Sequence, residues 1–393
     1  MKVLVCNAGS TSLKFQLFDM PEERVLAAGK IERVGSEDNA IFHYESKEGY
    51  QVELDKQRIP TYTAGIQMFL DCLVEPKHKV IDSLKELERV GFKTVLSKDH
   101  YGVHELTPEV LQGMEDYMVI APAHNAPYLS AIRQFQELVP HAKLVGAFET
   151  AFHTTVPLER AIYGIPYEWY ETYGIRRMGY HGASHEYVSD TVAAKYGTTG
   201  KTISCHLGGS CSLCAIDNGK SVDTSFGISL QVGINNSNRC GDIDPFIIPF
   251  LQKQGMELDE VLQGLTKRGG LLGISGVSND LRLVEEAAEQ GNERAGLAID
   301  IFCNDIIRYI GAYYAELGGV DHLVFTAGIG EHDAFIREKV CRKLAHMGIL
   351  LDEEKNQAVG NGAACISRDD SPVTIEVIPA NEELGVARKT YSL

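Results

Sequence analysis

The sequence lacks an excess of positive charge, and this absence limits the partners that the chain can bind. It has 37 Lys and Arg residues against 54 Asp and Glu residues, which gives a formal net charge of −17. A chain of this charge is repelled by nucleic acid and by anionic membrane surfaces, so we expect neither as a partner. An anionic ligand must then be held by local donor groups against the overall field.

The sequence also lacks long apolar runs and a cysteine framework. No apolar run has the length of a membrane span, and residues 1–20 show no signal-peptide pattern. The 9 cysteines are an odd number without framework spacing, which is typical of reduced thiols, so we expect a cytoplasmic protein. Cys211 and Cys214 form a C-x-x-C pair. On the strand expected there, their side chains point to opposite faces, which argues against a metal site.

The chain does contain one short motif twice. Gly-Ser-x-Ser-Leu occurs at residues 9–13 and again at 209–213, each time between two apolar runs. Each copy predicts a β-hairpin whose turn offers backbone N–H groups and hydroxyls to an anion, above all to phosphate. Ordinary tight hairpins also use Gly and Ser, but they need no matched offset. The repeat therefore favours two duplicated halves that close on a polyphosphate.

The length and composition agree with two folded domains. The chain has 393 residues, of which 44% are hydrophobic and 23% are charged. The repeat predicts two α/β domains that share a five-stranded mixed sheet as their core, with the ligand in a cleft between them. We expect the first domain to cover residues 1–150 plus 386–393 and the second to cover residues 151–385.

Hydrophobic spacing predicts the main elements of both domains. Residues 24–55 alternate in polarity, as further antiparallel strands do. Val90 to Leu96 predicts a short buried strand with Lys93 in its middle, and other strands are expected at residues 143–148, 321–327 and 373–378. Helical spacing occurs at residues 63–73, 79–87, 108–114, 248–254 and 258–265, from the Pro-rich turn 122–127 through residue 138, up to residue 196, and in one or two long helices within 285–317.

Three polar residues stand at positions where proteins often place functional groups. Glu149 follows a short buried strand, a typical position for a functional carboxylate in an α/β sheet, although a solvated helix N-terminus would look the same. His124 lies next to Asn125, a good N-cap residue, so a role in a turn or cap also explains it. Arg239 lies in the polar loop 233–245 among acids and amides, where a surface salt bridge is the alternative.

A positive patch is expected around residues 173–185. Arg176, Arg177, His181 and His185 lie there beside glycines in an otherwise acidic protein. His181 and His185 have the spacing of a zinc-binding helix. The Glu that such a helix carries is missing, and a Gly lies between the two histidines, so we expect no metal there.

Two further segments indicate a nucleotide and a cation. The Gly/Ser-rich loop 269–282 leads into a helix, and residues 321–331 form a strand, a glycine turn and a helix. The second pattern is common in nucleotide-binding proteins, because the backbone can approach the ligand there. Near the C-terminus, Asn381 caps a helix with Glu382 and Glu383 in its first turn. The helix dipole alone explains these acids, and metal binding explains them equally.

Together these segments resemble those of the acetate kinase family, within the acetate and sugar kinase/Hsp70/actin superfold. The resemblance runs nearly from end to end and rests on residues 7–15, 121–125, 150–153, 173–185, 221–225, 239–245, 270–276, 325–331 and 381–384. It implies an α/β fold of two duplicated actin-like (ribonuclease H-like) domains with mixed five-stranded sheets and an interdomain cleft. It also implies reversible phosphoryl transfer from ATP to a short carboxylate, giving ADP and an acyl phosphate, with Mg²⁺ or Mn²⁺ as the cofactor. The family is commonly dimeric, so a homodimer is expected, and the helix at 292–317 is a candidate interface.

The resemblance assigns roles to individual residues. Arg239 and His181 would hold the transferring phosphoryl group, with His124 assisting and Glu149 at the position of a catalytic Asp. Such positioned cations suit phosphoryl transfer, which depends on alignment and charge neutralisation. Asn7 and Glu382 would position the metal ion. The nucleotide would be bound by Ser10, Ser12, Lys14, His206, Gly208, Gly209, Ser210, Asp280, Leu281, Arg282, Gly328, Ile329, Gly330 and Glu331.

The departures from the family pattern are concentrated at the acceptor site. Lys93 stands where the family has the Arg that binds the substrate carboxylate, and Glu149 stands where it has an Asp. Lys keeps the charge but loses the bidentate fork of Arg. We therefore propose that Lys93 and Glu149 are a paired replacement. The acceptor pocket would contain Lys93, Val95, Tyr180 and Leu230, and it also changes at Ala123, Asn235 and Asn236.

Three functions are compatible with these residues. The first is an acetate kinase-like enzyme that uses acetate or propionate. The second is a kinase of a more polar acid, which Tyr180, Asn235 and Asn236 would favour. The third is a nucleotide-binding paralogue without catalysis. The retained Arg239 and His181 argue against the third function, since a protein without catalysis has no chemical need for them.

Overall fold

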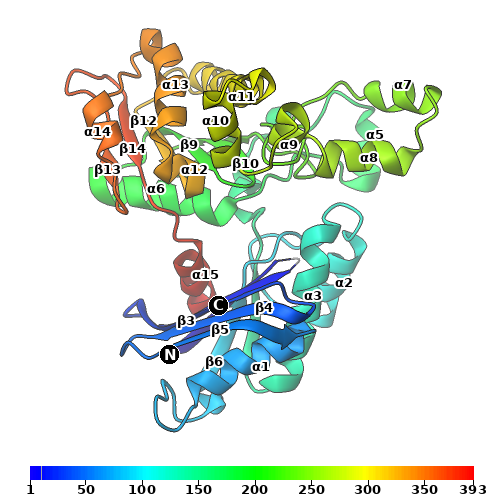
Figure 1. Ribbon diagram of the computed structural model, residues 1–393, viewed down its shortest axis with the longest axis vertical. Helices are drawn as coiled ribbons and strands as arrows, with labels where there is room; N and C mark the ends of the chain where they lie inside the picture. Colours follow the sequence, from blue (N-terminus) through cyan, green and yellow to red (C-terminus); the bar gives the residue numbers. More distant parts are fainter. Residues whose placement is uncertain (10) are drawn as a thin grey trace. The chain divides into compact units, whose positions relative to one another are not determined.

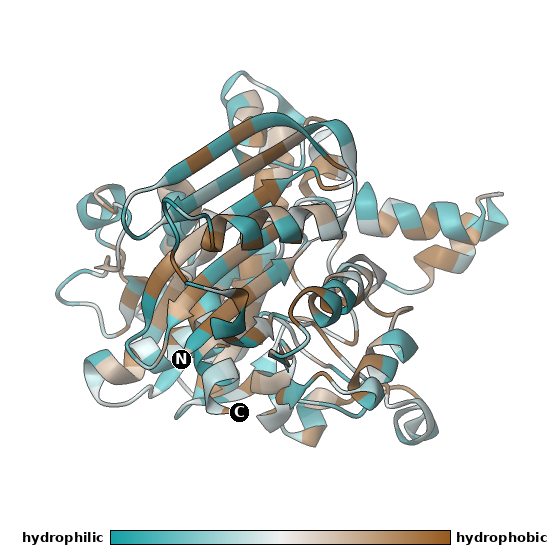
Figure 2. Cartoon of the chain, turned by 90° about the horizontal axis from the view of Figure 1, so that it is seen from below, coloured by the Kyte–Doolittle hydropathy of each residue, from teal (hydrophilic) through white to brown (hydrophobic). Residues whose placement is uncertain are grey.

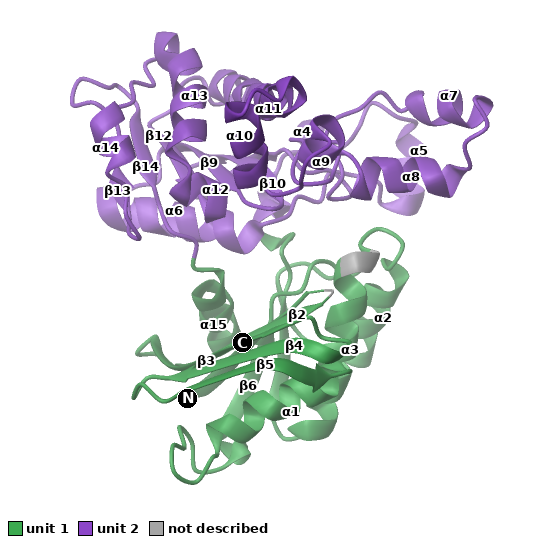
Figure 3. Ribbon diagram, viewed as in Figure 1, with its two compact units in different colours: residues 1–151, 381–393 green, residues 152–380 purple. Residues whose placement is uncertain are grey.

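The chain forms two compact units (Figure 1). The computed structural model describes residues 1–9 and 11–393, apart from the side chains of residues 122 and 123. Unit 1 contains Met1–Ala151 and Asn381–Leu393, and unit 2 contains Phe152–Ala380 (Figure 3). The sequence placed residues 381–385 in the second domain. They belong to unit 1 because the final helix, α15 (Glu382–Ser392), packs against the sheet of that unit as one piece.

Each of the two sheets contains the same arrangement of five strands as its core. Unit 1 has an eight-stranded sheet in the order β5-β4-β3-β2-β1-β6-β8-β7, and unit 2 has a six-stranded sheet in the order β11-β10-β9-β12-β14-β13. In β3-β2-β1-β6-β8 and in β11-β10-β9-β12-β14, antiparallel pairing gives way to parallel pairing at the middle strand. The predicted five-stranded mixed sheet is therefore the part common to both units, and the additional strands widen each sheet.

The strand bounds follow the chain order. Unit 1 contains β1 (Lys2–Ala8), β2 (Ser12–Asp19), β3 (Arg24–Glu32), β4 (Ser36–Ser46), β5 (Gln51–Ile59), β6 (Leu87–Phe92), β7 (Val103–Glu105) and β8 (Lys143–Ala147). Unit 2 contains β9 (Lys201–Leu207), β10 (Cys211–Asp217), β11 (Lys220–Thr224), β12 (His322–Thr326), β13 (Ala364–Cys365) and β14 (Thr374–Val377).

The motif that occurs twice forms two hairpins, but their registers differ. In the β1–β2 hairpin Ala8 pairs with Leu13, and in the β9–β10 hairpin Leu207 pairs with Cys211. Gly9 and Ser12 lie outside the first set of pairs, whereas residues 208–210 lie outside the second. The matched offset in the sequence therefore does not extend to matched turns.

The central strand of unit 1 is covered on both faces. Helix α15 covers one face, and α1 (Tyr62–Leu73) and α3 (Pro122–Leu138) cover the other (Figure 1). On the α15 side the apolar cluster contains Val3, Val5, Phe18, Met20, Ala147, Val386 and Ala387. On the other side, Phe69 of α1 stacks on Phe15 at 4.4 Å between ring centroids. This double cover explains why β1 reads as a continuous apolar run, whereas hydrophobic and hydrophilic residues alternate along other strands (Figure 2).

Unit 2 is built in the same way. Helix α11 (Glu293–Leu317) packs with Leu323 and Phe325 of β12 in the large core cluster. Val324, between them, faces Val188 and Val192 of α6 (Gly182–Tyr196) on the other side of the sheet. The other helices of unit 2 are α4 (Leu158–Ala161), α5 (Tyr167–Tyr173), α7 (Ile247–Lys253), α8 (Leu258–Lys267), α9 (Gly270–Ser275), α10 (Leu281–Glu289), α12 (Ala327–His332), α13 (Ala334–Leu344) and α14 (Glu353–Gln357), whereas α2 (Pro108–Asp116) belongs to unit 1.

Two predicted elements are wrong in ways that matter for the site. The helix expected at 79–87 is a single 3₁₀ turn at Leu84–Glu86, because Ser83 and Glu86 form a capping box and Leu87 pairs with Lys2 in the sheet. The strand expected at 90–96 is β6, which ends at Phe92, so Lys93 follows the strand. Within residues 1–9 and 11–393, none of the helices is long and apolar enough to span a bilayer.

Candidate active site

The carboxyl ends of three parallel strands bring the chemistry of unit 1 together. β1, β6 and β8 run parallel, and Asn7, Lys93 and Glu149 lie at or just beyond their ends. This edge is where open α/β sheets bind ligands. Asn381 caps α15 by accepting a hydrogen bond from Leu384 N at 3.3 Å, and the helix then begins with Glu382 at the same edge.

Lys93 lies between two carboxylates. Its ammonium donates a hydrogen bond to Glu382, and its Nζ is 3.7 Å from Glu149 Oε1. The side chains of Lys93, Glu149 and Glu382 are 16%, 6% and 13% exposed. Burial alone would lower the pKa of Lys93, but the charges of Glu149 and Glu382 outweigh it and raise that pKa. Lys93 and Glu149, proposed as a paired replacement, therefore lie close together, and Glu382 lies beside them.

The two candidate metal ligands are oxygen donors. The Tyr128 hydroxyl donates to Asn7 Oδ1 at 2.8 Å, and the Glu382 carboxylate accepts from Lys93. An amide oxygen and a carboxylate suit Mg²⁺, which keeps several waters and needs few protein ligands. Where side chains are described, no cluster of three or more His, Cys, Asp or Glu residues could hold a metal. The pair therefore fits Mg²⁺ and not a structural metal cage.

The first phosphate turn is only partly described. Ser10 lies outside the described residues. Gly9 N–H donates to the Ser12 carbonyl at 2.9 Å, and Lys14, an exposed side chain, pairs in register with Asn7. This places Lys14 at the same end of the sheet as the candidate metal ligand.

His124 lies in the first turn of α3 and is half-buried. The N-cap of this helix is Ala121, so neither His124 nor Asn125 is a capping residue. Asn125 instead donates to the carbonyls of Leu96 and Met114 at 3.1 and 2.8 Å. These bonds tie the start of α3 to the segment that follows Lys93.

The residues assigned to the acceptor pocket are mostly buried. Val95, Tyr180 and Leu230 are at most 6% exposed, and the side chain of Ala123 lies outside the described residues. The Tyr180 hydroxyl donates to the Ile228 carbonyl at 2.5 Å.

The two asparagines expected near this pocket are also bonded to the protein. Asn235 Nδ2 donates to Asp305 at 2.7 Å, and Asn236 Nδ2 donates to the Ile234 carbonyl at 3.3 Å. These donors, like the Tyr180 hydroxyl, serve the fold. These donors therefore give no reason to expect an acid more polar than acetate, whereas the amide oxygens of Asn235 and Asn236 are buried without a hydrogen-bond partner among the described residues.

His181 adopts an unusual backbone conformation at the start of α6. It has φ 57° and ψ 26° in the left-handed region, and its carbonyl accepts the His185 N–H at 3.0 Å. Residues other than glycine are uncommon there and are often functional. Gly179, two positions earlier, has φ 73°, and a Cβ added to it would lie 2.5 Å from the His153 ring. The segment leading into His181 is therefore fixed by close packing.

Arg239 and the β9–β10 hairpin complete this part of unit 2. Arg239 Nη1 donates to Ser210 Oγ at 2.9 Å, and burial lowers the pKa of the guanidinium. Its bonds to a hydroxyl and to the Leu230 carbonyl, together with its burial, argue against the alternative of a surface salt bridge. His206 stacks on His181 with ring centroids 3.9 Å apart. The hairpin thus touches both residues expected at the phosphoryl group.

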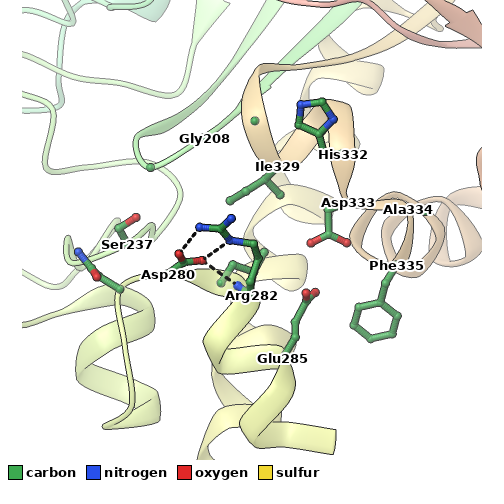
Figure 4. A pocket seen from close by; sticks show the side chains of 14 residues that line it. Gly208, Ser237, Asp280, Arg282, Glu285, Ile329, His332, Asp333, Ala334 and Phe335 are labelled. Atoms are coloured by element: carbon green, nitrogen blue, oxygen red, sulfur yellow. Dashed lines mark hydrogen bonds and ion pairs between the residues drawn. The ribbon is translucent and has the colours of Figure 1, made fainter. Parts of the chain in front are cut away.

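A cavity of about 870 Å³ lies in unit 2, a size typical of small-molecule sites (Figure 4). It contains many of the residues predicted to bind nucleotide, namely Gly208, Gly209, Asp280, Leu281, Arg282, Gly328 and Ile329. It also contains residues that the sequence analysis missed, namely Ser237, Asn279, Glu285, His332, Asp333, Ala334 and Phe335. Most of these directly follow or flank a predicted residue, so extending each glycine-rich segment by one helical turn would have found them.

Three glycines of this cavity are not explained by packing. A Cβ added at Gly328 would meet nothing within 4 Å, and at Gly208 and Gly209 the nearest atoms would be 3.5 and 3.6 Å away. None of the three has a positive φ. Neither space nor backbone conformation requires a glycine there, so what remains is room for a ligand to approach the backbone.

The sequence as a whole matches the acetokinase family over residues 2–388. The chain belongs to this family. It is 45% identical over 395 residues to an acetate kinase of Halothermothrix orenii, covering 99% of this chain and 98% of that protein. It is 43% identical to an acetate kinase of Treponema denticola over the whole of both chains.

Solved structures agree with the family assignment. The acetate kinase of Porphyromonas gingivalis superposes with a TM-score of 0.90 at 37% identity, covering 100% of this chain and 99% of that chain. A propionate kinase of Francisella tularensis superposes with a TM-score of 0.91 at 34% identity and the same coverage. The fold expected from the sequence, two actin-like α/β domains with mixed sheets, is thereby confirmed.

Two charged residues of the cavity lining are bonded to each other. Asp280 caps α10 and forms a bidentate pair with Arg282, whose Nε and Nη2 lie 3.0 and 2.5 Å from its oxygens (Figure 4).

Not every residue assigned to the nucleotide from the family resemblance lines the cavity. Gly330 is buried, with its carbonyl bonded to Arg337, and Glu331 accepts from Ala380 N at 2.9 Å. These last two residues therefore hold the glycine turn in place and are not part of the cavity lining.

Proposed function

We propose that this chain is a short-chain carboxylate kinase that transfers the γ-phosphoryl group of ATP reversibly to acetate or propionate. The products are ADP and an acyl phosphate. Membership of the acetokinase family over nearly the whole chain supports this function, as do relatives named acetate kinase and propionate kinase. The observation that carries it is the cavity of unit 2, because residues assigned to the nucleotide from distant parts of the sequence line one space.

The nucleotide would bind with its phosphates at the glycines and its base against apolar side chains. Gly208, Gly209 and Gly328 leave the backbone accessible, and Ile329 and Phe335 offer apolar surface in the same cavity. Phe335 is 51% exposed, so one face of its ring is available to a base.

The phosphoryl group would be held by Arg239 and His181. Phosphoryl transfer spreads negative charge over the equatorial oxygens, so fixed donors and cations around them lower the barrier. Asn7 and Glu382 would hold Mg²⁺, which neutralises phosphate charge when bound. Lys93 would attract the substrate carboxylate, and Glu149 would fix the position of the ammonium. His124 would assist from the first turn of α3.

We also propose that the enzyme is a homodimer with α11 at the interface. Leu297 lies on the exposed side of this helix and is 52% exposed, whereas the other side packs in the core of unit 2.

A hydroxamate assay tests the proposed function. Hydroxylamine traps acyl phosphate, so the full chain is incubated with ATP, Mg²⁺ and acetate, propionate, butyrate or glycolate in turn. We expect hydroxamate from acetate and propionate. The control is Arg239→Ala, which should lose about 10³-fold in rate, as for a lost transition-state cation. If none of the acids gives hydroxamate although the protein binds ADP, the proposed function is wrong.

A further inference from the structure

A continuous chain of imidazoles and hydroxyls lies behind His181. Ser204 Oγ is 2.9 Å from His185 Nδ1, His185 Nε2 is 2.9 Å from Ser212 Oγ, and Ser212 Oγ is 2.8 Å from His181 Nδ1. His185, Ser204 and Ser212 are at most 1% exposed. Helix α6 thus packs on β9 and β10 through polar side chains at this point.

The hydrogen atoms in this series of hydrogen bonds can be assigned because His185, which lies between the two serines, is neutral. Burial, followed by the neighbouring His153 and His206, lowers the pKa of His185 well below its usual value. A neutral imidazole carries one N–H, so His185 donates to one serine and accepts from the other.

Ser204 decides the direction. Among the described side chains, His185 Nδ1 is the one hydrogen-bond partner of Ser204 Oγ. If Ser204 only accepted, its hydroxyl proton would be buried without an acceptor, which proteins avoid. Ser204 therefore donates to His185 Nδ1, His185 Nε2–H donates to Ser212, and the Ser212 hydroxyl is left to donate to His181 Nδ1.

We infer that His185 is a positioning residue that acts through Ser212 to fix neutral His181 as the Nε2–H tautomer. His181 then presents an N–H donor to the oxygens of the transferring phosphoryl group. The opposite tautomer would present a lone pair to oxygens that can only accept. The role toward the phosphoryl group rests on the proposed function, whereas the tautomer itself does not.

We call the hydrogen-bonded series from Ser204 through His185 and Ser212 to His181 the relay. The backbone reinforces it. His185 N–H also donates to the His181 carbonyl at 3.0 Å, so the two residues are joined through both main chain and side chains. His206 stacks on the His181 ring and is held by Ser184, whose Oγ lies 2.8 Å from His206 Nδ1. The plane of the His181 ring is therefore fixed as well as its tautomer.

Another buried histidine, His153, provides an internal reference. His153 Nε2 is 2.9 Å from the Tyr180 carbonyl, and Nδ1 is 2.8 Å from Ser221 Oγ. A carbonyl only accepts, so His153 must be the Nε2–H tautomer. Burial lowers the pKa of His153 to about 4, so it stays neutral near pH 7.

Nitrogen-15 NMR of the histidine-labelled full chain measures both tautomers in one spectrum. The shifts separate protonated from unprotonated ring nitrogens, and His181→Asn and His153→Asn assign the signals. We expect His181 to show the same pattern as His153, with Nε2 protonated and Nδ1 unprotonated. A protonated His181 Nδ1 beside a normal His153 would overturn the inference, whether or not the chain is a kinase.

Variants separate positioning from stability. Ser212→Ala breaks the relay and should lower kcat by about 10-fold to 100-fold, as misplacement of a reacting group does, with an unchanged Kd for ADP. Ser212→Thr, which keeps the hydroxyl, should restore most of kcat. Ser221→Ala is the matched control, because it removes an equally buried hydroxyl from His153 and not from the relay. Equal losses of kcat in Ser212→Ala and Ser221→Ala would show a structural role only and would contradict the inference.

Discussion

Replacing Lys93 with Met tests the ion cluster at the edge of unit 1. Met keeps an unbranched stem of similar length and removes the ammonium. The carboxylates of Glu149 and Glu382, which are 6% and 13% exposed, then face each other without the cation that lies between them. The perturbation therefore changes charge much more than packing.

The expected loss of stability is large. Removing one partner of a buried ion pair costs about 3–5 kcal/mol, because a charge stays buried without compensation. Lys93 serves two carboxylates, so we expect a value in the upper half of this range. Against a total stability of roughly 5–15 kcal/mol, such a loss is easily measured. In Lys93→Met/Glu149→Gln one of the two remaining charges is also gone, and this double variant should recover about 1–3 kcal/mol relative to the sum of the single changes.

Urea unfolding followed by circular dichroism gives the free energy of unfolding for the four proteins of this cycle. The control is Lys79→Met, which removes the same charge from an exposed pair with Asp82 and should change stability little. If Lys93→Met costs less than about 1 kcal/mol, the cluster is not the buried network that the distances indicate. Additive losses in the double variant would show that Lys93 and Glu149 do not interact.

Three further predictions follow from the same structure. Lys93→Arg/Glu149→Asp should raise kcat/KM for acetate by more than the two single changes together, with a coupling free energy of about 1 kcal/mol. Additive effects would show that Lys93 and Glu149 do not act together in acceptor binding. Gly328→Ala should weaken ADP binding in calorimetry by about tenfold or more, or 1.4 kcal/mol, with Tm unchanged, whereas Gly311→Ala in α11, where an added Cβ also meets nothing within 4 Å, should leave ADP binding intact. The depressed pKa of His153, about 4 against 6.5, contributes stability that is present above pH 6.5 and is lost as pH falls through 4. This loss is about 3 kcal/mol, so the free energy of unfolding should depend less on pH in His153→Asn; an unchanged pH profile would show that His153 is not neutral in the fold.

The fold was largely predictable because local patterns and tertiary structure agree over most of the chain. The repeated motif predicted two related halves, and both contain the same five-stranded core. The segment Lys79–Leu87 shows where tertiary structure overrides spacing. Its helical spacing is real, but Leu87 is paired with Lys2 by the sheet, and the helix shrinks to one turn capped by Ser83.

Most contacts within the candidate site could not be predicted from the sequence. Glu382 was expected as a metal ligand together with Asn7, but its hydrogen bond with Lys93, which lies 289 positions away, was not expected. The relay was invisible for another reason. Ser204 and Ser212 are polar residues on strands, which usually indicates a solvated face, and only the packing of α6 shows that this face is buried. Sequence patterns give the period of a strand, but they do not show which polar groups will be enclosed together.

The two copies of the sheet also show how one architecture can support two kinds of chemistry. In each unit the parallel strands of the core end at one edge, where a ligand site is expected. The ends in unit 1 carry an amide, an ammonium and a carboxylate, which suit a cation and a small acid. The edge of unit 2 carries glycines and the stacked His181 and His206, which suit phosphate groups. The order of the core strands is the same, so the difference must come from the few residues at and near the strand ends. Substitutions at those residues should therefore change ligand preference with little effect on the fold, except at Lys93, where the site residue is also a buried charge.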